Sequence, residues 1–97
     1  ARFGGLDHRL EAQIVAHEGQ TEMETALELA TLGEKIRNLR GGGLSEGVST
    51  RLLVYAARLV VGGIAPRRAC DVAIARAVTD DRDVQHAIGQ IVDVLLP

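Results

Sequence analysis

The 97 residues carry 11 basic and 13 acidic side chains, a formal net charge of −2, which argues against a surface that binds DNA or RNA. Hydrophobic residues make up 46% of the chain but aromatic residues only 2%, a composition typical of closely packed helices rather than of a half-buried sheet. The single cysteine excludes an internal disulfide, and no segment resembles a signal peptide or a membrane span, so we expect one cytoplasmic helical domain over residues 1–97.

The first predicted helix spans residues 7 to 19. Asp7 is a good helix cap, and Gly19 is a good stop because glycine readily ends a helix. Leu10, Ile14 and Val15 recur at spacings that return to one face of a helix. We therefore expect these three side chains to face the core.

A second helix is predicted from residue 21 to about residue 40. Thr21 is followed three residues later by Glu24, which is the capping-box pattern. Arg40 suits the last turn because its charge is opposite to the dipole at that end, and Gly41 supplies the stop. The predicted buried stripe consists of Met23, Leu27, Ala30 and Ile36, with Leu32 and Leu39 at its flanks.

The glycine-rich residues 41–47 are predicted to form a loop and a hinge. After them, Ser49 is placed to cap a third helix, which ends at Gly62 and Gly63. The expected inward-facing residues of this helix are Leu52, Leu53, Ala56, Leu59 and Val60.

The rest of the chain predicts two more helices. Pro66 suits the first position of the fourth helix, in which Ala69, Ala73 and Ala77 form a ridge of small residues that lets another helix approach closely. Thr79 or Asp80 is the expected cap of the fifth helix. The predicted buried stripe of that helix is Val84, Ala87, Ile88, Ile91, Val92 and Leu95. The fold class is therefore predicted to be all-α, a small bundle of about five helices.

No residue pattern indicates a complete catalytic or metal site. The three histidines, His8, His17 and His86, have no spacing that joins them to Cys70 or to paired carboxylates as metal ligands. Cys70 lies in an apolar helix stripe, which favours a packed small hydrophobe over a nucleophile. The triple glycine at residues 41–43 is not followed by the lysine of a phosphate-binding loop. We expect the isolated chain to be neither a complete enzyme nor a metal protein.

Three arginines occupy positions that the helix dipole disfavours. Arg51 lies in the first turn of the third predicted helix, and Arg67 and Arg68 lie in the first turn of the fourth, where a cation costs roughly 0.3–1 kcal/mol. One interpretation is that an anion binds there, because exposed amides and a planar guanidinium together bind phosphate or carboxylate well. The other is that these are solvated surface arginines. Arg51, Tyr55 and Arg58 also share one helix face, which is either a protein interface or a solvated stripe.

Several segments resemble one group of ATPases. Residues 47–51 (GVSTR) resemble the Gly-x-Ser-x-Arg sensor 2 motif in the helical lid of AAA+ ATPases of the MoxR branch. More specifically, five segments spread along nearly the whole chain are similar to the CbbQ/NirQ/NorQ family: residues 14–18 (IVAHE), 36–40 (IRNLR), 47–59 (GVSTRLLVYAARL), 66–70 (PRRAC) and 79–81 (TDD). The opening residues 1–3 (ARF) resemble the end of that family's ATPase core. By this resemblance the chain is the C-terminal lid of a longer protein.

The resemblance implies a ring-forming, chaperone-like motor that uses ATP and Mg²⁺ in the full-length protein. It assigns Arg51 as the nucleotide-sensing arginine and Ser49 as its structural support. The family's Walker A, Walker B, sensor 1 and arginine-finger segments have no counterpart in these residues, so no catalytic residue is assigned within the chain and no cofactor is expected for the isolated fragment. The roles of Arg58, Arg67 and Arg68 are not assigned.

The partners implied by the resemblance are the rest of the ATPase core, neighbouring subunits of a homo-oligomeric ring, a von Willebrand factor A-domain protein and a target enzyme. In the CbbQ group the target is ribulose bisphosphate carboxylase (Rubisco), from which inhibitory sugar phosphates are released. In the NorQ and NirQ group the target is nitric oxide reductase or a related denitrification enzyme. No nucleic acid and no membrane insertion are expected.

A second function fits the same residues. The chain is then a free-standing helical interaction or assembly module, which holds a partner protein through the face of Arg51, Tyr55 and Arg58 without nucleotide chemistry. An upstream Walker A segment in the reading frame would favour the lid, whereas a frame complete near residue 97 would favour the module. As an isolated lid, the chain is expected to bind ATP negligibly and to self-associate through apolar surface that the core would otherwise cover.

Overall fold

Helices account for all regular secondary structure in the residues that the computed structural model describes, which are 8–39 and 48–96. In chain order they are α1 (His8–Gly19), α2 (Met23–Arg37), α3 (Thr50–Val61), α4 (Pro66–Cys70), the π-helical segment η3 (Asp71–Ala75), α5 (Arg76–Val78) and α6 (Arg82–Leu95). Because α4, η3 and α5 follow one another without a break, they form one helix with a π-helical middle. The prediction of an all-α fold with five helices is confirmed. The expected cap at Asp7, the stop at Gly41 and the loop of residues 41–47 lie outside the described residues.

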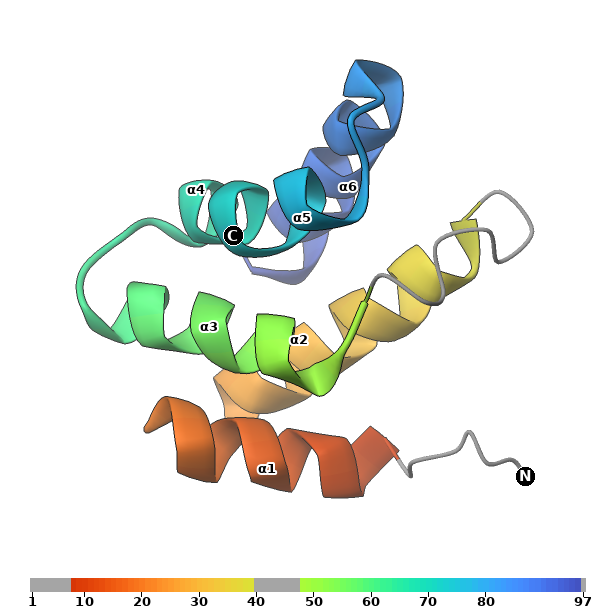
Figure 1. Ribbon diagram of the computed structural model, residues 1–97. Coiled ribbons are helices and arrows are strands. Elements are labelled where there is room, and N and C mark those ends of the chain that lie inside the picture. The colour runs from red at the N-terminus through yellow and green to blue at the C-terminus, as the bar shows by residue number, and fades with distance from the viewer. Residues whose placement is uncertain (1–7, 40–47, 97) are drawn as a thin grey trace.

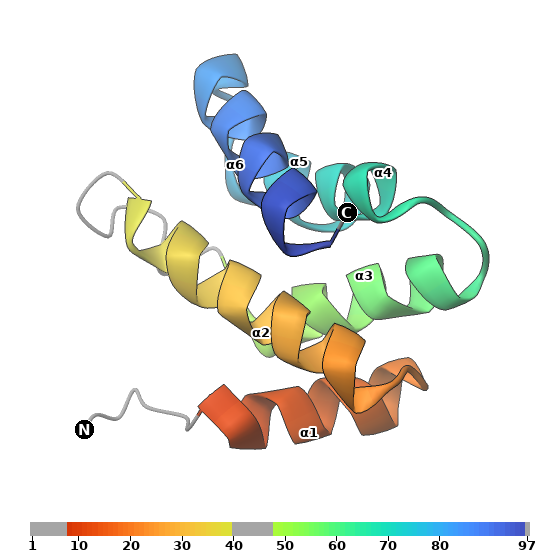
Figure 2. The same ribbon diagram turned by 180° about the vertical axis from the view of Figure 1, so that it is seen from behind.

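The helices lie in two layers. Helix α1 packs against both α2 and α3, which also contact each other. Above them in Figure 1 lies the second layer, in which the α4–η3–α5 helix packs on α3. Figure 2 shows from behind that α6 lies above α2, and α6 also contacts α4 and η3.

Small aliphatic side chains fill the core. Eight of the twenty buried hydrophobic residues in the described part of the chain are alanines, and the largest fully buried side chains include Leu29, Leu53 and Ile88. Small side chains let helix backbones approach closely. At the α1–α3 contact, a Cβ placed on Gly19 would lie only 2.6 Å from the Cβ of Ala57, so this position accepts glycine alone without a shift of the helices.

Helix α1 buries a different face from the predicted one. Val15 is buried as expected, but Leu10 and Ile14 are 48% and 39% exposed. The buried residues of α1 are Glu11, Ala12, Val15 and Gly19. The prediction failed because Glu11 finds polar partners on two other helices, which lets a carboxylate replace a leucine in the core.

The turn between α1 and α2 shows that the predicted capping box is wrong. Gln20 adopts a left-handed conformation (φ 58°), and the amide of Thr21 donates to the carbonyl of Ala16 at 3.1 Å. This is the pattern of a Schellman motif, which closes the C-terminal end of a helix. Thr21 therefore closes the end of α1. Helix α2 begins at Met23, with Glu22 in the N-cap position and no side-chain hydrogen bond that caps the helix. Met23, predicted to be inward, is 41% exposed.

The predicted starts and stripes of the later helices are mostly confirmed. Helix α3 begins directly after Ser49 and ends before Gly62, and Pro66 opens α4. The predicted core residues found buried in α2, α3 and α6 are Ala30, Leu32, Ile36, Leu53, Ala56, Val84, Ile88 and Val92. The other predicted residues of these stripes in the described part of the chain, Met23 apart, are half-buried: Leu27, Leu39, Leu52, Leu59, Val60, Ala87, Ile91 and Leu95. Helix α2 ends at Arg37, before the expected end.

Two details of the C-terminal half differ from the prediction. Ala69 and Ala73 are buried, but Ala77 is exposed, because the wider turns of η3 shift the four-residue spacing that would keep the ridge on one face. The cap of α6 is Asp81, whose carboxylate accepts from the amides of Asp83 (2.8 Å) and Val84 (3.4 Å). Neither predicted residue caps the helix.

Candidate functional site

The start of α3 carries Arg51, the predicted nucleotide-sensing arginine, and Ser49, its predicted structural support. Ser49 has an extended backbone (φ −108°, ψ 162°), and its carbonyl accepts from the amides of Leu52 at 3.1 Å and Leu53 at 3.4 Å. The Ser49 hydroxyl makes no capping hydrogen bond within the described residues. Ser49 thus starts the helix through its backbone, and its side chain does not occupy the amides of the first turn.

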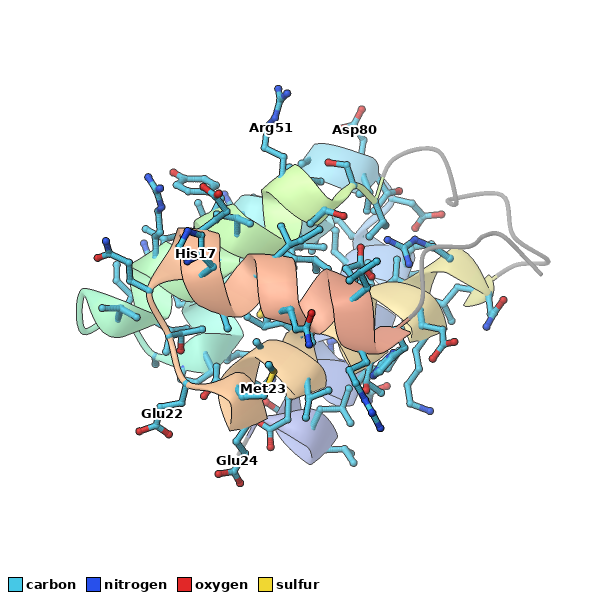
Figure 3. All side chains as sticks on the ribbon, turned by 90° about the horizontal axis from the view of Figure 1, so that it is seen from below. His17, Glu22, Met23, Glu24, Arg51 and Asp80 are labelled. Carbon is cyan, nitrogen blue, oxygen red and sulfur yellow. The ribbon has the colours of Figure 1, made fainter. Side chains whose placement is uncertain are left out.

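Arg51 projects from this turn. Its side chain is exposed and points away from the helices (Figure 3). Within the described residues it has no ion pair and no side-chain hydrogen bond. A guanidinium without a carboxylate partner can bind an external anion with both prongs of its planar fork.

A buried carboxylate fixes the backbone just before Arg51. Glu11 of α1 is 3% exposed, and its Oε2 accepts from the Thr50 hydroxyl at 2.7 Å and from Arg37 Nη2 at 3.1 Å. The Arg37 guanidinium also donates to the carbonyl of Val48, from Nε at 3.4 Å and from Nη2 at 3.3 Å. One carboxylate therefore joins α1, the end of α2 and the start of α3. Since charge-assisted bonds of this kind are strong in a low dielectric, the position of Arg51 is set by the domain core.

The sequence prediction does not include Glu11 and Arg37. The two residues lie 26 positions apart, on helices whose relative placement no local pattern reveals. One signal was available: Glu11 precedes Val15 by four residues and so shares its helix face. A carboxylate on a buried face requires a partner, and Arg37 is that partner.

Arg58, two turns along α3 from Arg51, is engaged within the molecule. Its Nε donates to the carbonyl of Glu18 at 3.0 Å, near the end of α1, where the helix dipole favours a cation. Tyr55 is 48% exposed between the two arginines. The face of Arg51, Tyr55 and Arg58 thus combines a guanidinium that has no partner among residues 8–39 and 48–96 with one that closes a neighbouring helix.

The histidines and the cysteine form no metal site within the part of the chain that the structure describes. The described residues contain no group of three or more histidine, cysteine, aspartate or glutamate side chains placed to hold a metal ion. His8 lies 3.1 Å from the Thr31 hydroxyl through Nε2, whereas His86 lies on α6. Cys70 is fully buried, and burial raises the pKa of its thiol to about 12, so it stays protonated at neutral pH. Its burial among core residues agrees with the predicted packing role.

None of the described helices combines the length and the apolar character that crossing a bilayer requires.

Three known proteins and one family model match most of this chain. A family model described as CbbQ/NirQ/NorQ C-terminal matches residues 11–95. Protein CbbQ from Hydrogenophilus thermoluteolus is 44% identical over 92 residues, which cover 90% of this chain and 34% of that protein. The denitrification regulatory protein NirQ from Pseudomonas aeruginosa is 42% identical over 93 residues (96% of this chain, 36% of that protein). Protein NorQ from Paracoccus denitrificans is 44% identical over 78 residues (80% and 29%). The chain spans about a third of the length of these relatives.

Proposed function

Since the chain belongs to the CbbQ/NirQ/NorQ family, as its C-terminal domain, we propose that it is the lid of an ATPase in which Arg51 contacts the γ-phosphate of ATP. The observation that carries the proposal is the exposed Arg51 guanidinium, without a partner among the described residues, on a turn that Glu11 and Arg37 hold. The helix dipole makes this position unfavourable for a cation. A γ-phosphate would offset that cost with a charge-assisted hydrogen bond, which is worth about 1.5–3 kcal/mol.

The residues of this chain decide which part of ATP hydrolysis we assign to this domain and which to the rest of the protein. Arg51 supplies a fixed positive charge, and phosphoryl transfer depends on such charge around the γ-phosphate. The phosphate cradle and the Mg²⁺ ligands belong to other parts of the protein. Because the contact requires a triphosphate and weakens when the γ-phosphate leaves, the position of the lid would follow the state of the nucleotide.

The proposal extends to the partners of the whole protein. They are the rest of the ATPase core, neighbouring subunits of a homo-oligomeric ring, a von Willebrand factor A-domain protein and a target enzyme that the motor activates. Because CbbQ and a denitrification regulatory protein match the chain at 44% and 42% identity, the proposal keeps both target classes, Rubisco and nitric oxide reductase.

The test replaces Arg51 in the full-length protein. Arg51→Ala is expected to lower steady-state ATP turnover at saturating ATP by at least about tenfold, because a charge around the γ-phosphate is lost. The thermal midpoint should not fall, since the side chain is exposed and makes no bond to the described residues. Arg51→Lys should restore little turnover, because an ammonium lacks the two-pronged geometry of a guanidinium.

Arg58→Ala is the matched control on the same helix. It should retain ATP turnover and lower the thermal midpoint slightly, because the bond to the Glu18 carbonyl is lost. Wild-type turnover in Arg51→Ala together with low turnover in Arg58→Ala would contradict the sensor role. That pattern would favour the free-standing interaction module, which uses the face of both arginines and Tyr55.

A further inference from the structure

A charged groove of about 890 Å³ lies between the α4–η3–α5 helix and the first half of α6. Its charged lining consists of four arginines and two aspartates, together with one histidine: Arg67, Arg68, Arg76, Arg82, Asp71, Asp80 and His86. Arg67 and Arg68 are the pair that the sequence marks as misplaced at a helix start. The role proposed for Arg51 involves neither Arg67 nor Arg68.

Two of the four arginines have structural partners. Arg67 Nη1 pairs with Asp93 of α6 at 2.5 Å, and a Cβ placed on Gly89 would lie only 2.6 Å from Arg67 Nε. The Arg67 guanidinium therefore lies directly on the α6 backbone and ties α4 to α6. Within the α4–η3–α5 helix, Arg76 Nε pairs with Asp71 at 3.0 Å. These pairs shape the groove and neutralise part of its charge.

The other two arginines have no partner in the described part of the chain. Arg68 of α4 and Arg82, the first residue of α6, are both exposed and contribute to the lining from two different helices. Among the residues that line the groove, these two guanidinium groups face a single aspartate, Asp80, once the internal ion pairs are set aside. The lining thus keeps an excess of positive charge, although Asp81 and Asp83 flank Arg82 in the sequence and the formal net charge of the chain is −2.

We propose that this groove binds an acidic segment of a partner protein, whose carboxylates pair with Arg68 and Arg82. Carboxylates are singly charged and spaced along a peptide, which suits two guanidinium groups on separate helices. A phosphate group is a poorer fit, because the Asp81 carboxylate already occupies the amides of Asp83 and Val84 at the start of α6. Asp71 and Asp80 in the lining would also repel a doubly charged phosphate more than a single carboxylate.

The test measures binding of a fluorescein-labelled octaglutamate peptide to the full-length protein by fluorescence anisotropy. The wild type should bind the peptide with an affinity that falls as salt is added. Arg68→Glu and Arg82→Glu should each weaken binding by about tenfold or more, which is the loss of about one charge-assisted bond. Both residues are exposed, so the thermal midpoints of the two variants should stay close to that of the wild type.

Lys35→Glu is the matched control, because it makes the same charge change at an exposed position on α2, away from the groove. It should weaken binding by about twofold at most. Wild-type binding in Arg68→Glu and Arg82→Glu, or an equal loss in Lys35→Glu, would overturn the proposal. Inorganic tripolyphosphate should compete weakly with the peptide; displacement of the peptide at equal charge concentration would show that the groove prefers phosphate and would overturn the assigned partner chemistry.

Discussion

At the scale of single residues, Glu11 is a buried carboxylate that connects α1 to α2 and α3. Its carboxylate is almost fully buried, whereas the side chain of its partner Arg37 is 31% exposed. Surface ion pairs contribute little to stability, but removing one member of a buried pair leaves an uncompensated charge in the core. The contribution of the Glu11–Arg37 pair to stability is expected to be closer to that of a buried pair than to that of a surface pair, because Thr50 also donates to the same carboxylate oxygen.

Glu11→Gln is expected to lower the free energy of unfolding by about 1–2 kcal/mol, because glutamine keeps the shape of the side chain but loses the charge that strengthens two hydrogen bonds. Glu11→Ala should cost about 3 kcal/mol, since Arg37 then loses its carboxylate partner altogether. Urea unfolding followed by circular dichroism measures both values.

Glu22→Gln is the control for these variants. Glu22 is exposed and makes no side-chain cap at the start of α2, so this change should alter stability by less than about 0.5 kcal/mol. Equal stabilities for Glu11→Gln and Glu22→Gln would show that the buried carboxylate does not stabilise the fold.

At the scale of elements, the starts of helices were predictable where local chemistry alone decides them. Ser49 and Pro66 correctly mark the starts of α3 and α4. Because Arg51 follows Ser49 by two residues, its place in the first turn of α3 was predictable as well. The capping box failed because Thr21 is already used to close α1.

The errors in helix faces have two physical causes. The face of α1 depends on partners of Glu11 that lie 26 and 39 residues away, which no local pattern contains. The exposed Ala77 depends on η3, a π-helical segment that composition and periodicity do not reveal. The position of Arg51 in the first turn of α3 was therefore predictable, but the residues that hold this turn were not.

The turn that ends α1 gives a prediction for stability. Gln20 adopts φ 58°, a conformation that costs a side-chain-bearing residue energy and glycine very little. Gln20→Gly is therefore expected to raise the free energy of unfolding by about 0.5–1 kcal/mol. Gln13→Gly, an exposed position inside the same helix, should lower it by about 1 kcal/mol. Chemical denaturation measures both changes. A gain in stability for Gln20→Gly together with a loss for Gln13→Gly would confirm the left-handed turn, whereas a loss in both variants would contradict it.

At the scale of the whole molecule, the outer face of α1 is a surface that the fold leaves apolar against expectation. Leu10 and Ile14 lie four residues apart on this face and are both exposed. Exposed apolar patches tend to be covered by a partner surface. We expect the rest of the protein or a neighbouring subunit to cover this face.

The isolated domain should accordingly self-associate through α1. The double variant Leu10→Lys with Ile14→Lys is expected to abolish the association, because two charges would be buried in the contact. Val94→Lys is the control, since Val94 is 78% exposed on α6 and has no part in that face. Sedimentation velocity over a range of concentrations measures the effect. A wild-type domain that stays strictly monomeric at high concentration would contradict a covered apolar face.

The alanine-rich core also determines how the domain responds to force. Alanine has no rotamers to lose, so burying eight of them costs no side-chain conformational entropy. Contacts between alanine side chains also cannot adjust by a change of rotamer when one helix is displaced, as contacts between long side chains can. A pull on the first turn of α3 is therefore passed to α1 and α2 through Glu11 and through the contact at Gly19, instead of being absorbed by repacking. We therefore expect the described helices to move together when the first turn of α3 is displaced.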